Sequence, residues 1–294
     1  MRVLVAGSSG FLGCALVSEL REHGHEVRRL VRRAPAADDE HRWDPPAGSI
    51  ADGALDGVDA VVNLCGSPMT PGRWTEARKQ AMKDSRVEPT EVLSEAMAEH
   101  GIGTLVNASG IDFYGDTGDV EVDESAGEGA GFLAGLAAEW ELATQAAQDA
   151  GARVVRLRTG MVLAPGGGML RILKPLFLVG LGGKLGDGRQ YVPWISRPDH
   201  AAAMRFAVEN DALRGPVNLV APNPVTNAEF TLALGKALRR PAPWFVPKPA
   251  LSLVLGGDAV EPIMSSHNAR PKALADAGFM FRHERLDEAL AAVL

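Results

Sequence analysis

The sequence contains only two cysteines, Cys14 and Cys65, among 294 residues. Two cysteines supply neither a disulfide framework nor a cluster of metal ligands, and we expect both to act as small hydrophobic residues in a reducing compartment. The seven histidines are scattered along the chain, without a metal-ligand spacing such as H-x-x-x-H. The sequence therefore predicts no metal site.

Long apolar runs are also missing. No run approaches the ~20 residues that a membrane-spanning helix needs, and the first run, residues 3–6, is interrupted by Gly7 too early for a secretion signal. Positive charge is in deficit, with 30 Lys and Arg against 37 Asp and Glu and a net charge of −7 at pH 7. These absences predict a cytoplasmic protein without a membrane or nucleic-acid partner.

Over its first 160 residues the sequence alternates short apolar runs with helical patterns. The runs are rich in Val and Leu and mostly lack polar alternation, which is typical of strands covered on both faces. We therefore predict an α/β fold with a Rossmann-like, doubly wound parallel sheet. Its strands are expected at residues 2–6, 26–31, 59–64, 104–108 and 153–158, and its helices at residues 11–23, 75–99 and 130–150.

Beyond residue 160 the composition changes. Glycines crowd residues 166–188 and prolines recur between 241 and 249, which leaves little room for long elements. We predict that residues 161–294 form a smaller C-terminal α/β part on the substrate side, and that about the last 50 residues are helical. Residues 1–160 are expected to form the cofactor-binding domain, to which a later segment at about residues 195–220 returns.

A glycine-rich segment follows the first predicted strand and opens the first predicted helix: Gly7-Ser8-Ser9-Gly10-Phe11-Leu12-Gly13. A dinucleotide fingerprint requires this strand–loop–helix context. Gly7 permits a tight turn, Gly10 lets the backbone approach phosphate, and Gly13 permits close packing of helix on sheet, while the helix N-terminus offers N–H groups to a pyrophosphate. The segment predicts a dinucleotide site; a glycine-rich turn without a ligand is the alternative. The side chains expected to line the site are those of Ser9, Phe11 and Leu12.

The spacing of this segment is G-x-x-G-x-x-G, and further motifs accompany it along the chain. They include Val62-Asn63-Leu64-Cys65-Gly66, Phe113-Tyr114-Gly115-Asp116, Arg158-Thr159-Gly160-Met161-Val162-Leu163 and Pro222-Asn223-Pro224-Val225-Thr226-Asn227. Together they resemble the short-chain dehydrogenase superfamily, and within its extended, nucleotide-sugar-epimerase-like branch the subgroup called epimerase family proteins. The resemblance covers nearly the whole chain. It implies a Rossmann domain followed by a small C-terminal domain of unknown function, and it implies no particular substrate.

The second predicted strand indicates which dinucleotide is bound. An NAD enzyme usually ends this strand with Asp or Glu, which accepts hydrogen bonds from the ribose hydroxyls. Here the strand is followed by Arg32 and Arg33. A guanidinium suits the 2′-phosphate of NADP, so NADP is favoured over NAD; a solvated basic turn is the alternative.

The resemblance places further residues around the cofactor. Trp43 is expected near the adenine, with a buried structural tryptophan as the alternative. The Leu64-Cys65-Gly66 strand end is expected to border the nicotinamide half. Ser109 and Thr159 complete the expected cofactor-binding set.

Short-chain dehydrogenases usually catalyse with a Ser or Thr and a Y-x-x-x-K pair, in which the tyrosine is the general acid and base. Ser109 ends the fourth predicted strand and is the candidate for the orienting hydroxyl; a serine that caps its own backbone is the alternative. The window where the pair should fall has Phe132 and Leu136 instead. Tyr114 is the nearer substitute and the second catalytic candidate.

On the substrate side we expect Arg86, Tyr191 and Trp194 to bind a small and in part anionic molecule. The structural alternatives are a solvated helix face for the basic residues and a core position for the tryptophans. The sequence also departs locally from the subgroup, because Asp112 stands where glycine is common.

The leading hypothesis is an NADP-dependent oxidoreductase or epimerase that works by hydride transfer. The alternative is a non-catalytic protein that senses NADP, and superfamily membership leaves a homodimer open.

Overall fold

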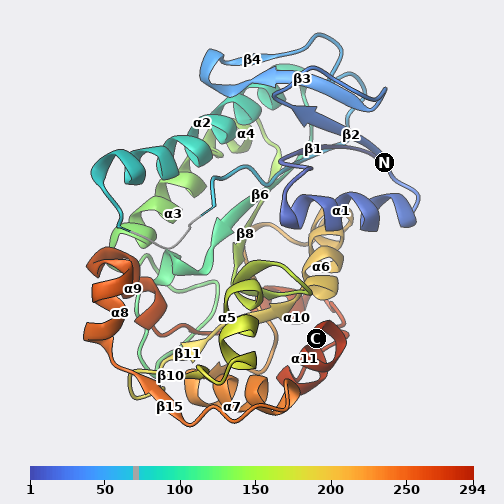
Figure 1. The fold of residues 1–294 in the computed structure, drawn as a ribbon. Coiled ribbons are helices and arrows are strands. Elements are labelled where there is room, and N and C mark those ends of the chain that lie inside the picture. Colours follow the sequence, from blue (N-terminus) through green and yellow to red (C-terminus); the bar gives the residue numbers. More distant parts are fainter. Residues whose placement is uncertain (69–72) are drawn as a thin grey trace.

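A sheet of eight strands runs through the larger part of the molecule (Figure 1). The computed structural model describes residues 1–68 and 73–294, except for the side chains of residues 254, 255 and 257–259. Within the described residues the strand order is β13-β8-β6-β5-β1-β2-β3-β4, and only the β3–β4 pair is antiparallel. The strands are β1 (Arg2–Ala6), β2 (Glu26–Val31), β3 (Glu40–Asp44), β4 (Ser49–Ile50), β5 (Ala60–Asn63), β6 (Thr104–Gly110), β8 (Arg153–Thr159) and β13 (Gly215–Leu219).

Helices cover both faces of the sheet, because the side chains of each strand alternate between the two faces. In β1, Val3 and Val5 join the core beneath α1 and α6, whereas Leu4 and Ala6 join the core beneath α2 and α4. All four side chains are fully buried, and full burial of a Val or Leu contributes about 1.5–3 kcal/mol. Figure 1 shows the two helical layers. The elements are α1 (Phe11–Glu22), α2 (Glu76–His100), α3 (Phe132–Leu142), α4 (Gln145–Asp149) and α6 (Arg197–Glu209), with the short turns η1 (Pro45–Ala47) and η2 (Ile111–Tyr114).

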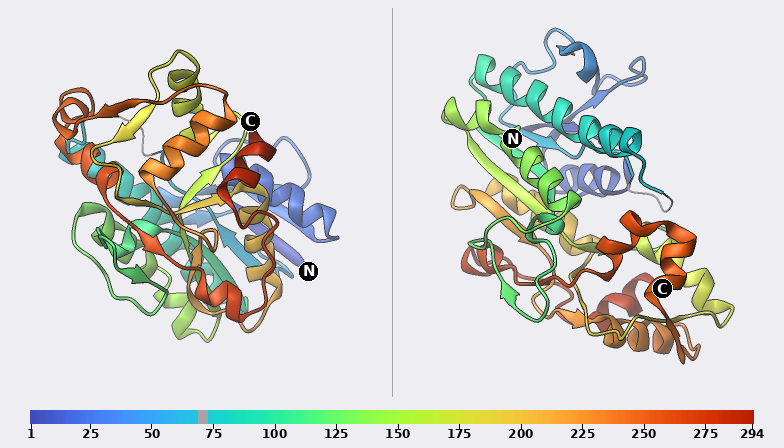
Figure 2. Two further views of the ribbon diagram at one scale, coloured as in Figure 1. Left: turned by 90° about the horizontal axis from the view of Figure 1, so that it is seen from below. Right: turned by 90° about the vertical axis from the view of Figure 1, so that its left-hand side faces the viewer.

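The remaining elements gather into a smaller part below the sheet in Figure 1, and Figure 2 shows it from two other sides. Its core contains the buried side chains of Leu163, Phe177, Phe230 and Leu290. The elements are β7 (Glu121–Val122), β9 (Met161–Leu163), α5 (Gly168–Leu178), β10 (Gly183–Leu185), β11 (Tyr191–Val192), β12 (Trp194–Ser196), β14 (Val225–Thr226), α7 (Asn227–Ala237), β15 (Trp244–Val246), α8 (Lys248–Leu255), α9 (Gly257–Met264), β16 (Asn268–Ala269), α10 (Lys272–Asp276) and α11 (Leu286–Val293).

The predicted α/β fold with a parallel, doubly wound sheet is confirmed. The five predicted strands are present, with ends shifted by at most two residues. The single helix predicted over residues 130–150 is wrong, because the chain breaks into α3 and α4. At the break the Thr144 hydroxyl donates to the backbone oxygen of Glu141 at 2.6 Å, a local bond that competes with helix continuation. The segment around residues 195–220 supplies α6, which packs on α1, and the edge strand β13; the domain boundary itself stays a prediction.

The sheet order reverses between β1 and β5. From β1 the chain winds outward through β2 and β3, and from β5 it winds the other way through β6 and β8. Open α/β sheets bind ligands outside the carboxyl ends of the strands at this switch point. The segments that start there are residues 7–13 and 64–66. Among the described residues, no helix combines the length and hydropathy that crossing a membrane requires.

Candidate cofactor and substrate site

The glycine segment after β1 is held by close backbone contacts. Gly7 has φ of +78°, and a Cβ there would lie 2.8 Å from the carbonyl carbon of Leu64. A Cβ at Gly13 would lie 2.2 Å from the backbone oxygen of Gly7. A side chain at Gly7 or Gly13 would therefore push apart β1, the start of α1 and the end of β5. These contacts fit the roles predicted for the two glycines.

Gly10 differs from the other two glycines because a Cβ there would meet only the Gly7 oxygen, at 3.2 Å. Its outer side is open, and no side chain caps the N-terminus of α1. The first-turn N–H groups of this helix can therefore receive an anion. A cradle of this shape fits the pyrophosphate of a dinucleotide.

The side chains between the glycines divide into two kinds. Ser9 is exposed beside Gly10, whereas Leu12 is half-buried against the core of the α1 face. The Phe11 ring packs on Gly167 at the start of α5, where a Cβ would lie 2.1 Å from the ring. The dinucleotide segment and the C-terminal part of the chain are thus in direct contact.

The two arginines after β2 lie in different environments. Arg33 donates to both carboxylate oxygens of Glu40, at 2.8 and 2.6 Å, so its guanidinium is already paired and the phosphate role predicted for it is not favoured. Arg32 is exposed and has no hydrogen bond or ion pair with any residue that the structure describes. Burial raises the pKa of Cys65 to about 12, and the nearby charge of Arg32 opposes this rise. Arg32 is therefore close enough to the end of β5 for its charge to act on Cys65.

The other residues expected around the cofactor are placed as follows. Trp43 is buried in the core beneath α2, which favours the structural alternative over a contact with adenine. Leu64 and Cys65 contact Gly7 through their backbone. Thr159 lies with its hydroxyl 3.2 Å from Nε2 of His200.

Ser109 belongs to a buried ionic network. Its hydroxyl donates to Oε1 of Glu141 at 2.8 Å, and Arg158 donates to the two oxygens of the same carboxylate at 2.8 and 2.9 Å. The Arg158 guanidinium stacks 3.4 Å from the ring centre of Phe113. The Ser109 hydroxyl is thus committed to holding β6 against α3, and this arrangement does not favour the predicted catalytic role.

Tyr114 is also buried, and its hydroxyl donates to Oδ1 of Asn218 at 2.8 Å. Burial raises the pKa of Tyr114, which makes its phenol a weaker acid. The hydroxyl connects η2 to β13 and does not line the pocket described below. The geometry favours a structural role, and the catalytic role expected of Tyr114 stays a prediction.

The three residues expected to clamp a substrate are not brought together. Arg86 is buried and donates to the backbone oxygens of Met82 and Ser67, at 3.0 and 3.1 Å, so that it braces the loop after β5. Trp194 is fully buried, with its indole N–H donating to the oxygen of Asn223. Tyr191 pairs in the short β11–β14 ladder. Trp194 therefore serves as a core residue, and Arg86 serves to hold the loop after β5. Neither lines the pocket described below.

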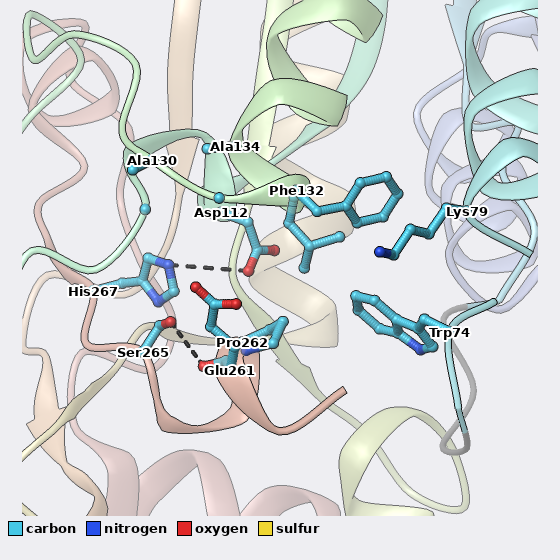
Figure 3. Close-up of a pocket in the computed structure, with 13 residues that line it drawn as sticks. Trp74, Lys79, Asp112, Ala130, Phe132, Ala134, Glu261, Pro262, Ser265 and His267 are labelled. Carbon is cyan, nitrogen blue, oxygen red and sulfur yellow. Dashed lines mark hydrogen bonds and ion pairs between the residues drawn. The ribbon is translucent and has the colours of Figure 1, made fainter. Parts of the chain in front are cut away.

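A pocket opens between α2, α3 and α9 (Figure 3). It holds about 440 Å³ of space, including its open mouth. At one end the side chains of Asp112, Glu261 and His267 point toward one another; at the other end Lys79, Trp74 and Phe132 gather. Phe132 stands where the missing tyrosine was expected, so the pocket occupies the position of the usual chemistry.

Asp112 and His267 both line this pocket, with Oδ1 and Nε2 separated by 4.0 Å. Burial raises the pKa of Asp112 and lowers the pKa of His267. The one sequence signal for Asp112 was its departure from the glycine of the resemblance. No sequence signal pointed to His267, which lies 155 residues further along the chain. Within the described ranges, no group of three or more His, Cys, Asp or Glu is arranged to hold a metal ion.

Comparison with known proteins agrees with this geometry. The NAD dependent epimerase/dehydratase family matches residues 3–220, and a domain of unknown function, DUF1731, matches residues 246–293. An epimerase family protein of Mycobacterium bovis is 52% identical over 288 residues, which cover 98% of this chain and 96% of the relative.

Solved structures extend the likeness to the whole fold. The crystal structure of human epimerase family protein SDR39U1 with NADPH has a TM-score of 0.92 and 32% identity, and the match covers 100% of this chain and 99% of that one. MoeE5 in complex with UDP-glucuronic acid and NAD shares the fold at 24% identity, with a TM-score of 0.78 and coverage of 100% and 97%. The chain belongs to the NAD dependent epimerase/dehydratase family.

Proposed function

We propose that this protein binds NADP(H) and uses it for hydride transfer to or from a small molecule held in the pocket of Figure 3. The observation that carries the proposal is a backbone anion site with a cation near it. Gly7 and Gly13 hold the turn closely packed, Gly10 leaves room for a pyrophosphate, and Arg32 has no partner among the described residues. When bound, the nicotinamide supplies or accepts the hydride.

The choice of NADP over NAD rests on the two arginines after β2. A guanidinium pairs well with a 2′-phosphate, whereas a carboxylate at this point would repel it. Arg33 is held by Glu40, which leaves Arg32 as the residue for the phosphate. The presence of NADPH in the related human structure supports this choice.

The pocket supports a reaction on a small molecule with a flat apolar part. Trp74 and Phe132 meet edge to face, with ring centres 6.0 Å apart, and Lys79 lies 5.5 Å from the Phe132 ring. Such walls bury an apolar group, while the few polar side chains at the other end fix its orientation. The homodimer and the cytoplasmic location stay predictions.

One specific observation favours the alternative, a non-catalytic NADP sensor. The usual acid and base are replaced by Phe132 and Leu136, and the hydroxyls of Ser109 and Tyr114 are committed elsewhere. A sensor would bind NADPH tightly and would transfer no hydride.

The experiment that tests the proposal has two stages. Thermal unfolding with NADPH or NADH comes first, because a ligand at about 100 times its Kd stabilises the fold by about 2.7 kcal/mol; we expect the larger shift with NADPH. NADPH carrying deuterium at the transferable position is then incubated with aldehydes, ketones and α-keto acids. The methyl esters of the keto acids are tested in parallel, and the products are analysed by mass spectrometry. Deuterium in a product supports hydride transfer, and binding without any transfer supports the sensor.

A further inference from the structure

The pocket of Figure 3 contains two titratable side chains that face each other, Asp112 and His267. Asp112 comes from η2, directly after β6, and His267 comes from the segment before β16. Neither the Asp112 carboxyl nor the His267 ring forms a hydrogen bond with another residue that the structure describes, and Oδ1 of Asp112 lies 4.0 Å from Nε2 of His267. The His267 side chain is 6% exposed and the Asp112 side chain is 25% exposed, so both can be reached from the pocket. A ligand in the pocket can therefore contact both side chains.

Hydrogen bonds hold the backbone on both sides of the pair, so the positions of the two side chains are fixed by the fold. Two hydrogen bonds join the segment of Asp116 and Thr117 to the segment of Ser266. Thr117 N–H donates to the backbone oxygen of Ser266 at 2.8 Å, and Ser266 N–H donates to the side-chain Oδ1 of Asp116 at 3.1 Å. The N–H of His267 donates to the oxygen of Tyr191 at 3.2 Å. Two parts of the chain about 150 residues apart are thereby fixed in register, as a preorganised site requires.

The separation of the pair fits one bound oxygen atom. A distance of 4.0 Å is too long for a direct hydrogen bond. An oxygen placed about 2.8 Å from both Oδ1 and Nε2 forms two ordinary hydrogen bonds. A substrate carbonyl or hydroxyl oxygen can therefore bridge the two side chains.

Other charged groups near the pair influence its protonation. The charge of Arg86 favours the ionised form of Asp112, and the charges of Asp112 and Asp116 favour the protonated form of His267. Glu261 faces the pair across the pocket, and Lys79 lies at the far end.

We propose that Asp112 and His267 together hold the proton that accompanies hydride transfer, in place of the missing tyrosine and lysine. The inference rests on the proposed function. In reduction, a hydride from NADPH forms the new C–H bond at the carbonyl carbon, the C=O π electrons move to oxygen, and that oxygen takes a proton from the pair. NADPH is oxidised to NADP⁺, the carbonyl is reduced to the alcohol, and water returns the proton to the pair.

Burial suits the pair to this task. In water a carboxylic acid and an imidazolium differ in pKa by roughly 2–3 units. Burial raises the pKa of Asp112 and lowers that of His267, so it brings the two values toward each other. A proton is then shared more evenly between the two groups, and either group can release it to a bound oxygen.

The first test compares D112N and H267N with D119N, an exposed carboxylate of the same region that does not line the pocket. With any carbonyl compound that the wild type reduces, we expect D112N and H267N to lose about 10²–10⁴-fold in kcat. Their Kd for NADPH should stay within about twofold, since the glycine segment is untouched. D112E should recover part of the rate. The alkaline limb of the pH profile for reduction, where the pair has lost its proton, should change in D112N.

The second test needs no substrate. Ring nitrogen signals of His267, assigned by their loss in H267N, are followed by NMR against pH in the wild type and in D112N. We expect the pKa of His267 to fall in D112N, because the charge that favours its protonated form is removed. An unchanged value would overturn the pair even before a substrate is known.

The outcomes separate the two proposals. If the wild type reduces a carbonyl compound and D112N and H267N keep more than about a third of its rate, the proton pair is overturned while the proposed function stands. If the wild type binds NADPH and transfers deuterium to none of the compounds, the proposed function fails and the pair falls with it. Loss of rate with retained NADPH binding and a shifted His267 pKa supports the pair.

Discussion

Replacement of Arg32 by Asp tests the cofactor assignment most directly. Arg32 is exposed and has no partner among the described residues, so R32D breaks no internal contact and should leave the thermal stability nearly unchanged. In the complex, its guanidinium is expected to pair with the 2′-phosphate. The variant removes that pairing and puts a carboxylate near a phosphate.

The size of the effect follows from the bonds that are lost. A hydrogen bond to a charged group contributes about 1.5–3 kcal/mol, which corresponds to about 10- to 150-fold in Kd. We expect R32D to weaken NADPH binding by that factor and to leave NADH binding unchanged or improved, since a carboxylate can accept hydrogen bonds from the ribose hydroxyls. Fluorescence titration with both cofactors measures the ratio.

A matched control stands next in the sequence. Arg33 is bound by Glu40, so R33A should change the Kd for NADPH by no more than about threefold, which is about 0.6 kcal/mol. The reasoning is refuted if R32D leaves the ranking of the two cofactors unchanged. It is also refuted if R33A costs as much NADPH affinity as R32D.

Three further predictions concern the same framework. G13A should abolish measurable NADPH binding in titrations, because its Cβ would lie 2.2 Å from the Gly7 oxygen, whereas G103A, with no atom within 4 Å, should bind normally. E141L leaves Arg158 buried without its carboxylate, and should cost about 3–5 kcal/mol of stability, seen as a fall in Tm of roughly 6–20 °C; a fall under about 2 °C would contradict this. Arg33 holds the pKa of Glu40 at about 2, below its ordinary 4.5, so the stability that this carboxylate adds is present above pH 4.5 and lost as the pH falls toward 2. Melts across that range should show a smaller acid loss in E40Q.

The glycine segment could be predicted from the sequence because its geometry is local. Gly7, Gly10 and Gly13 lie within one strand–loop–helix unit, and the close contact between Gly7 and Gly13 is set inside that unit. The apolar runs were predictable for a similar reason, since strands buried on both faces have little choice of residue. The Ala-rich helix was misjudged, because Thr144 interrupts a stretch whose helix propensity alone would continue.

The catalytic candidates could not be predicted in the same way. The sequence places Ser109 and Tyr114 near the carboxyl end of β6. Their hydroxyls, however, form hydrogen bonds with residues far along the chain. Glu141 accepts from Ser109 across 32 positions, and Asn218 accepts from Tyr114 across 104. Position along a strand determines which edge of the sheet a residue occupies; it does not determine what its side chain meets.

The contact between Phe11 and Gly167 has a consequence for how this chain can change. Gly167 does not need glycine for its backbone, since its φ is −133°; it needs glycine because the Phe11 ring occupies the space of a Cβ. The two positions are therefore epistatic. G167A should be harmful beside Phe11 and tolerated beside a smaller residue, so that a double-mutant cycle of F11A and G167A gives a large coupling energy. Homologues that differ at one of these positions are expected to differ at the other, and an engineered change at either must treat the pair as one unit.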